Sequence, residues 1–190
     1  MRKLFLFNFI TLDGFFEGPG HDISWHNVDA EFNEFAVQQL DEIGTLLFGR
    51  VTYELMAGYW PTPTGIEDDP VVARMMNTME KVVFSRSLTK AEWSNTRLVK
   101  ENAGKEVERL KQQTGKDIGI FGSANLAAEF IRLGLVDEFR LMVNPVVLGK
   151  GVPLFNQPIN ELLLQNERVK LFRSGNVLLC FRPIKEGSPS

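Results

Sequence analysis

The sequence has very little cysteine and histidine. Its 190 residues include one cysteine and two histidines, so it can form no internal disulfide and offers no cluster of thiolate or imidazole ligands for zinc. We therefore expect no metal site. Cys180 lies in an alternating apolar run near the end of the chain, and we expect it to be a core residue.

The chain also lacks a basic excess and any long apolar run. A formal net charge of -3 gives no electrostatic argument for a nucleic-acid partner. No uninterrupted apolar segment approaches the roughly 20 residues that a membrane span requires. The amino end has only a superficial likeness to a signal peptide, because Asn8 interrupts its apolar run and Asp13 follows without a small-residue cleavage pattern. We expect a cytoplasmic protein whose partner is a small molecule.

The composition is the ordinary balance of a globular protein, with 44% hydrophobic and 24% charged residues. A length of 190 residues is enough for one well-packed domain and short for two. No internal repeat or low-complexity linker divides the chain. We expect one domain over residues 1–184 and a disordered tail over residues 185–190.

Residues 46–54 (Leu-Leu-Phe-Gly-Arg-Val-Thr-Tyr-Glu) join an apolar run to the start of a helix through a glycine. A buried strand that passes into a helix N-terminus presents free backbone N–H groups and a positive dipole end, which attract an anion. Arg50 adds a planar cation that suits a phosphate. A purely structural interpretation stays open, because many strand-to-helix corners carry glycine and a surface arginine.

A second corner of the same kind occurs at residues 117–126, where a predicted strand ends in Gly122 and Ser123 is placed as a helix cap. A third strand, over residues 81–87, leaves Ser85 and Arg86 at its carboxyl end, either as a phosphate site or as a polar loop. In open parallel sheets the carboxyl ends of neighbouring strands line a common crevice. The corners therefore predict one ligand groove, but neither has the three-glycine fingerprint of a standard dinucleotide fold.

The rest of the chain alternates strands and helices. We expect a strand over residues 3–12, a loop over 15–28 that is a lid or binding element, and a helix capped by Asp29 that runs to about residue 43. Trp25 in that loop is either a core anchor or a wall of a site. Residues 162–172 and 177–181 read as an antiparallel hairpin. The pattern predicts an α/β fold.

Six short motifs occur in order, at residues 11–14, 49–54, 84–87, 121–123, 135–138 and 145–155. With these motifs the sequence resembles the dihydrofolate-reductase-like family, in particular the branch that includes the reductase domain of the bacterial bifunctional riboflavin-biosynthesis deaminase-reductase. The resemblance covers most of the chain. It implies a three-layer α/β fold with a mostly parallel central sheet and an antiparallel carboxyl-terminal hairpin.

The resemblance also implies a site for NADPH. Its pyrophosphate and phosphate contacts fall on Gly49, Arg50, Thr52, Ser85, Arg86, Gly122, Ser123 and Ala124, and the backbone of Phe9 and Ile10 faces the nicotinamide. This placement agrees with the anion sites expected at the helix N-termini. Arginine and hydroxyl side chains favour NADPH over NADH.

For the reaction, the resemblance implies reduction of a pteridine- or pyrimidine-like molecule. It also implies that the protein forms a homodimer. In folate reductases an acid on the first helix supplies the proton, and Asp29 or Glu31 is its nearest match here. Asp29 is also explained as a helix cap. Asp13, Trp25 and Phe32 are the expected substrate contacts. The first strand lacks the lysine usual in riboflavin reductases, so another heterocyclic or carbonyl substrate is open. The alternative function is a nucleotide- or small-molecule-binding module without turnover.

Overall fold

The computed structural model describes residues 1–184, and the predicted tail over 185–190 lies outside the described residues. The strands are β1 (Leu4–Thr11), β2 (Phe15–Glu17), β3 (Ile43–Gly49), β4 (Glu80–Phe84), β5 (Thr96–Val99), β6 (Asp117–Phe121), β7 (Glu138–Asn144), β8 (Val152–Pro153), β9 (Leu164–Leu171) and β10 (Val177–Pro183). The helices are α1 (Ala30–Asp41), α2 (Arg50–Ala57), α3 (Pro63–Asp68), α4 (Pro70–Thr78), α5 (Ala103–Gln112) and α6 (Ala124–Arg132), with a 3-10 turn η1 (Pro19–His21).

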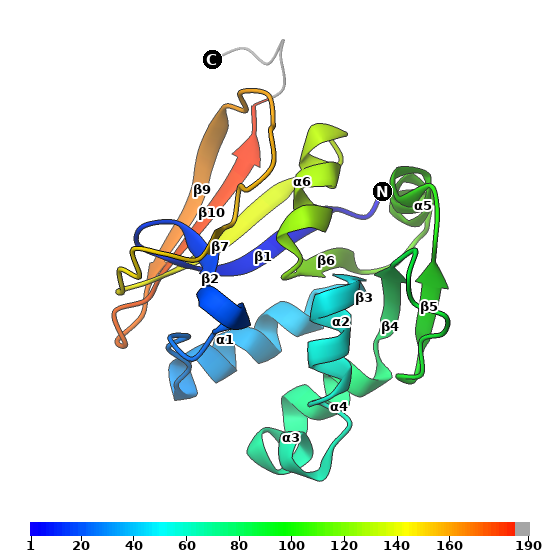
Figure 1. The fold of residues 1–190 in the computed structure, drawn as a ribbon, viewed down its shortest axis with the longest axis horizontal. Coiled ribbons are helices and arrows are strands. Elements are labelled where there is room, and N and C mark those ends of the chain that lie inside the picture. The colour runs from blue at the N-terminus through cyan, green and yellow to red at the C-terminus, as the bar shows by residue number, and fades with distance from the viewer. Residues whose placement is uncertain (185–190) are drawn as a thin grey trace.

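Eight strands form one twisted sheet in the order β5-β4-β3-β6-β1-β7-β10-β9 (Figure 1). From β5 to β7 every neighbouring pair is parallel, whereas β10 runs antiparallel to both β7 and β9. The predicted parallel sheet with an antiparallel carboxyl-terminal hairpin is therefore confirmed. Strands β2 and β8 make a separate two-stranded ribbon.

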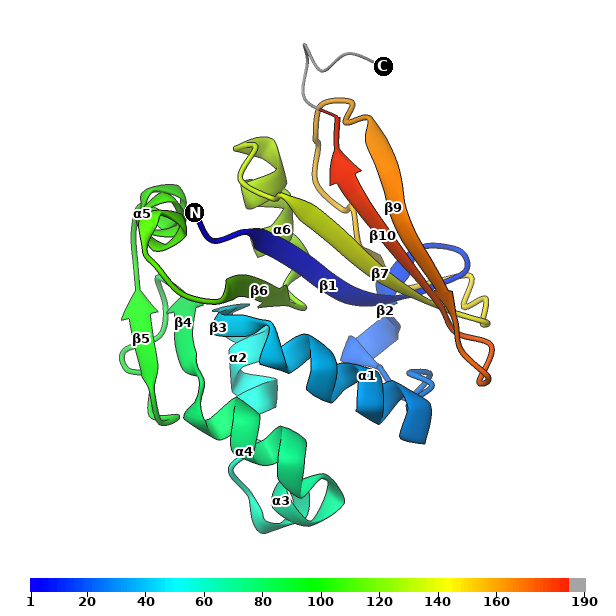
Figure 2. The same ribbon diagram turned by 180° about the vertical axis from the view of Figure 1, so that it is seen from behind.

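Helices cover both faces of the sheet, which gives three layers. Helices α1, α2 and α4 lie on one face and α5 and α6 on the other, as the two opposite views show (Figure 1 and Figure 2). Alternate residues of β1 serve the two cores: Phe5 and Phe7 pack with α1 and α4, and Leu4 and Leu6 pack with α5 and α6. A strand buried on both faces reads as a continuous apolar run, which explains the sequence of β1.

Several elements differ from the prediction in their limits. The loop expected over residues 15–28 contains β2 and η1, and the segment from Pro63 to Asp68 forms the short helix α3. Pro63 is tolerated there because a proline in the first helical turn loses no hydrogen bond, and the Thr62 hydroxyl accepts from the Gly65 amide at 3.2 Å. Cys180 is buried, as expected.

The segment before α1 is fastened to the turn of the β9–β10 hairpin by asparagine side chains. The Asn27 amide N–H donates to Asn144 Oδ1 at 2.9 Å, Asn27 Nδ2 donates to the Ser174 carbonyl at 2.9 Å, and Asn176 Nδ2 donates to the Asn27 carbonyl at 2.7 Å. Asn144 and Asn176 are fully buried. These contacts hold residues 22–28 against the sheet.

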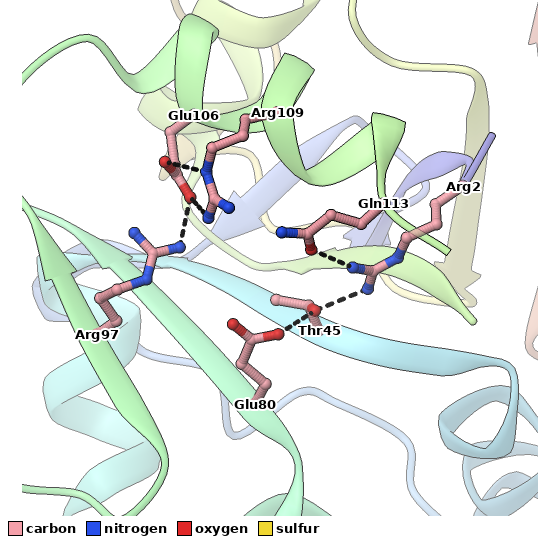
Figure 3. A network of polar contacts seen from close by, with 7 residues as sticks. All are labelled: Arg2, Thr45, Glu80, Arg97, Glu106, Arg109 and Gln113. Carbon is pink, nitrogen blue, oxygen red and sulfur yellow. Dashed lines mark hydrogen bonds and ion pairs between the residues drawn. The ribbon is translucent and has the colours of Figure 1, made fainter. Parts of the chain in front are cut away.

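A polar network joins the amino ends of the parallel strands (Figure 3). Arg2 Nη2 donates to Thr45 Oγ1 at 2.7 Å, and Thr45 Oγ1 donates to Glu80 Oε2 at 2.8 Å. Arg2 and Thr45 are both buried, so their polar atoms depend on one another for hydrogen bonds.

Among residues 1–184, no helix has the length and apolar character needed to cross a membrane.

We expect the substitution Thr45→Val to lower the free energy of unfolding by about 1–3 kcal/mol, because it leaves the buried Arg2 guanidinium short of an acceptor. Urea denaturation measures this loss. The matched control is Thr96→Val on strand β5, where the hydroxyl makes one exposed contact of 3.4 Å. Equal urea midpoints for the two variants would show that the network contributes nothing.

Candidate functional site

A large cavity opens at the carboxyl ends of the parallel strands. Its volume is about 1480 Å³, and residues from the ends of β1, β3, β4, β5 and β6 line it. Pockets for drug-sized ligands measure roughly 300–1000 Å³, so this cavity has room for a dinucleotide and a second small molecule. Among the described residues no three His, Cys, Asp or Glu side chains are grouped so as to hold a metal ion.

Most of the residues predicted to contact a cofactor meet in this cavity. Its lining includes Phe9, Gly49, Arg50, Thr52, Ser85, Arg86, Gly122, Ser123 and Ala124. Ile10 is the exception, because its side chain packs against the small core of Ala124, Leu141 and Leu154. The structure thus brings the predicted corners around one hollow, while their role in cofactor binding stays a prediction.

The two strand-to-helix corners are bonded to each other. Ser123 Oγ accepts a hydrogen bond from the Gly49 amide at 2.7 Å and donates one to Thr52 Oγ1 at 2.9 Å. Ser123 was predicted to cap α6, but its side chain makes no capping bond, because the residue is left-handed with φ 59° and its hydroxyl is directed at the other corner. Its contribution is therefore to hold the starts of α2 and α6 together.

The first amides of α2 and α6 consequently have no side-chain cap. Free N–H groups and the positive end of the helix dipole make such N-termini attractive to anions. The corner is also tight, since a Cβ at Gly49 would lie 2.7 Å from Ser123 Oγ and one at Gly122 would lie 2.8 Å from Thr52 Cγ2. Glycine at both positions therefore allows the two corners to approach each other this closely.

Cationic side chains gather at the β4–β5 end of the cavity. Arg86, Lys100 and Lys105 line it, and none of them makes a side-chain hydrogen bond or ion pair with any residue from 1 to 184. Arg50 pairs with Glu54 at 2.7 Å in an exposed contact of small energetic value. These groups can serve a phosphate. Sequence reasoning found Arg86 but missed both lysines. Lys100 directly follows β5, and Lys105 lies in the first turn of α5.

The opposite end of the cavity is aromatic. The His26 ring stacks on Phe9 with centroids 4.3 Å apart and planes inclined by 15°, and Phe32 lies 5.0 Å from Phe9. Burial lowers the pKa of His26 to about 4, although the Asp22 carboxylate acts in the opposite direction. Nε2 of this neutral imidazole is buried without a partner. Sequence reasoning did not single out His26.

The two predicted acids are engaged elsewhere. Asp29 Oδ1 accepts from the Phe32 amide at 2.8 Å and caps α1, and Glu31 Oε2 accepts from the Arg173 amide at 2.9 Å. Neither residue belongs to the cavity lining. The geometry therefore gives no support to proton transfer by Asp29 or Glu31.

The predicted substrate contacts are divided in the same way. Phe32 lines the cavity, but Asp13 and Trp25 do not. Asp13 accepts from the Gly149 amide at 2.8 Å and from the Thr11 hydroxyl, and Trp25 Nε1 donates to the Asp22 carbonyl at 3.1 Å. Both side chains thus fasten loops near the cavity.

Strand order and the position of the cavity define the class of protein: this is an α/β protein of the dihydrofolate-reductase-like fold. A family model described as the RibD C-terminal domain matches residues 2–179. The chain belongs to this family.

A protein of known sequence and several solved structures are similar to this chain. The chain is 37% identical to the uncharacterized protein YyaP of Bacillus subtilis (strain 168) over 183 residues, which is 95% of this chain and 94% of that one. A putative riboflavin biosynthesis protein from Shewanella sp. PV-4 superposes with a TM-score of 0.75 at 18% identity, over 96% of this chain and 99% of that one.

A third relative is a two-function enzyme. The diaminohydroxyphosphoribosylaminopyrimidine deaminase/5-amino-6-(5-phosphoribosylamino)uracil reductase of Thermotoga maritima superposes with a TM-score of 0.69 at 15% identity. The match covers 96% of this chain and 57% of that one, so the chain corresponds to part of the larger enzyme. Likeness at these identities establishes the fold.

Proposed function

We propose that the protein is an NADPH-dependent reductase of a pyrimidine- or pteridine-like small molecule. The observation that carries the proposal is the continuity of one cavity, from the uncapped starts of α2 and α6 to the aromatic end at Phe9. The family to which the chain belongs supports the proposal, and so does its structural likeness to an enzyme with uracil reductase activity.

The residues of the cavity fit the coenzyme part by part. Free amides of the two helices suit the pyrophosphate, and glycine at positions 49 and 122 lets the two helix starts that carry these amides pack closely together. Arg86, Lys100 and Lys105 suit the 2′-phosphate. When bound, NADPH supplies a hydride.

At the aromatic end, Phe9 and Phe32 offer flat apolar surfaces that stack on a heterocycle and exclude water. Reduction of a C=N or C=O bond adds hydride to the carbon and a proton to the heteroatom, and a hydrogen-bonding group beside the heteroatom orients it for proton transfer. We assign that contact to His26, whose buried Nε2 has no partner in the protein. Its pKa of about 4 keeps the ring neutral at pH 7, so it acts as a hydrogen-bonding group there.

We expect the variant Arg86→Gln to weaken NADPH binding by roughly tenfold, equivalent to about 1.4 kcal/mol, and to leave NADH binding unchanged. The reason is that the guanidinium faces the phosphate that only NADPH carries. Fluorescence titration measures both dissociation constants. The control is Arg74→Gln, an exposed arginine on α4 outside the cavity lining.

Failure of the unmodified protein to bind NADPH below millimolar concentration would overturn the proposed function. An equal loss in Arg74→Gln would show that net charge, and not a phosphate contact, is responsible.

A binding module without turnover is the second candidate, and it is favoured by the absence of Asp29 and Glu31 from the cavity lining. Steady oxidation of NADPH with a pterin or a ribosylaminopyrimidine eliminates it.

A homodimer also stays a prediction. The exposed apolar side chains of Leu163, just before the edge strand β9, and of Val169 and Leu171 on it are compatible with one.

A further inference from the structure

Asn8 is a buried polar side chain in the middle of β1 that has no partner. It is 2% exposed, and both Oδ1 and Nδ2 lack a hydrogen bond. Buried amides are almost always hydrogen-bonded, because leaving the donor and acceptor unpaired costs the full desolvation of both. The strand is apolar on either side of it, so a leucine would fit the fold better. Asn8 is therefore poorly explained by the stability of the ligand-free protein.

The position of Asn8 links it to the cavity. Alternation along β1 places its side chain on the same face as Leu4 and Leu6, towards α6, and Asn8 itself lines the cavity together with Ala124 at the start of that helix. Asn156, from the segment after β8, lines the same cavity and also has a buried, unpaired Oδ1. Two segments far apart in the chain thus place buried, unpaired amide oxygens at the same cavity.

A side-chain amide has a fixed pattern: one carbonyl acceptor beside an N–H donor in a single plane. A phosphate or a carboxylate accepts only, so it would satisfy Nδ2 and leave Oδ1 unpaired. A group with adjacent C=O and N–H satisfies both atoms at once. The complement of Asn8 is therefore another amide.

We propose that Asn8 is a specificity-determining residue that pairs with an amide group of the bound ligand. This inference rests on the proposed function, which offers two sources of that chemistry: the carboxamide of the nicotinamide ring and the ring amide of a pyrimidine or pteridine. Both place a C=O next to an N–H.

The test compares Asn8→Leu with the unmodified protein in the absence and presence of ligands. Without ligand, the variant has a melting temperature about 2–4 °C higher, because the unpaired amide is gone. With ligand, affinity falls roughly tenfold for whichever molecule carries the amide. The ligands are NADPH, 2′-phospho-ADP-ribose, which lacks the nicotinamide ring, and 5,6-diaminouracil. The control is Asn160→Leu, an exposed asparagine outside the cavity lining.

Each outcome has one meaning. Weaker NADPH with unchanged 2′-phospho-ADP-ribose identifies the nicotinamide carboxamide, and weaker 5,6-diaminouracil with unchanged NADPH identifies the substrate amide. Unchanged affinity for both, in a protein that binds NADPH, overturns the role of Asn8 and leaves the reductase intact. Absence of NADPH binding in the unmodified protein overturns the reductase itself. A lower melting temperature in Asn8→Leu shows a structural role and also overturns the inference.

Discussion

Replacing Gly122 by alanine is expected to lower the free energy of unfolding by about 2–4 kcal/mol and to weaken NADPH binding by roughly tenfold or more. Gly122 has φ +69°, which disfavours any side chain, and an added Cβ would lie 2.8 Å from Thr52 Cγ2 and 2.9 Å from Thr52 Oγ1. Thr52 is 8% exposed and accepts the Ser123 hydrogen bond, so it has little freedom to move. The clash separates the starts of α2 and α6.

Two further variants divide this loss into its causes. Gly134→Ala has a similar φ of +66° with nothing within 4 Å of the new Cβ, so it measures the backbone cost alone, about 1 kcal/mol. Adding Thr52→Ala to Gly122→Ala removes both clashing atoms and should recover part of the stability. Urea unfolding of the single and double variants gives the coupling energy. Strictly additive losses would mean that Thr52 is not what Gly122 must avoid.

Acidification is expected to destabilise the protein through His26 by about 3 kcal/mol between pH 6.5 and pH 4. Burial, opposed by Asp22, lowers the pKa of His26 from its ordinary value of 6.5 to about 4 in the folded state. In this interval the unfolded chain binds a proton at His26 and the folded protein does not, so stability rises with pH. The contribution is fully present above pH 6.5 and is lost as the pH falls to about 4.

The measurement is the free energy of unfolding across this pH range for the unmodified protein and for His26→Phe, which keeps an aromatic ring against Phe9. The variant should have a flatter profile. Asp22→Asn should have a steeper one, because removal of the carboxylate lowers the pKa of His26 further. A profile that His26→Phe leaves unaltered would place the acid sensitivity on other groups.

The fold could be predicted because apolar runs and helix caps, which are local features of the sequence, keep their roles in the folded protein. Apolar runs ending in Gly49 and Gly122 became neighbouring parallel strands, because such runs are buried on both faces and their carboxyl ends meet at one edge of the sheet. Asp29 begins a helix as expected, since a carboxylate cap acts over three residues and needs no distant partner. Motifs defined by local backbone geometry were therefore predictable.

The residues that line the aromatic end of the cavity were harder to predict, because their role depends on the direction in which each side chain points. Successive helical residues point about 100° apart, so Phe32 faces the cavity while the adjacent Glu31 reaches Arg173. The signal for Asn8 was visible as a polar residue inside an apolar strand. Whether such a residue finds a partner depends on β7 and α6, which are more than one hundred residues away in the chain.

The asparagine contacts between residues 22–28 and the β9–β10 turn have a consequence for biosynthesis. Asn27 is held by Ser174 and Asn176, which leave the ribosome long after the first strand has emerged. Until that late hairpin is made and docked, Asn27, the neighbour of His26, lacks two of the hydrogen bonds that fix its position. The two strand-to-helix corners are therefore synthesised before Asn27 can form these bonds, and the aromatic end of the cavity is completed only after residues 174–176 have been made.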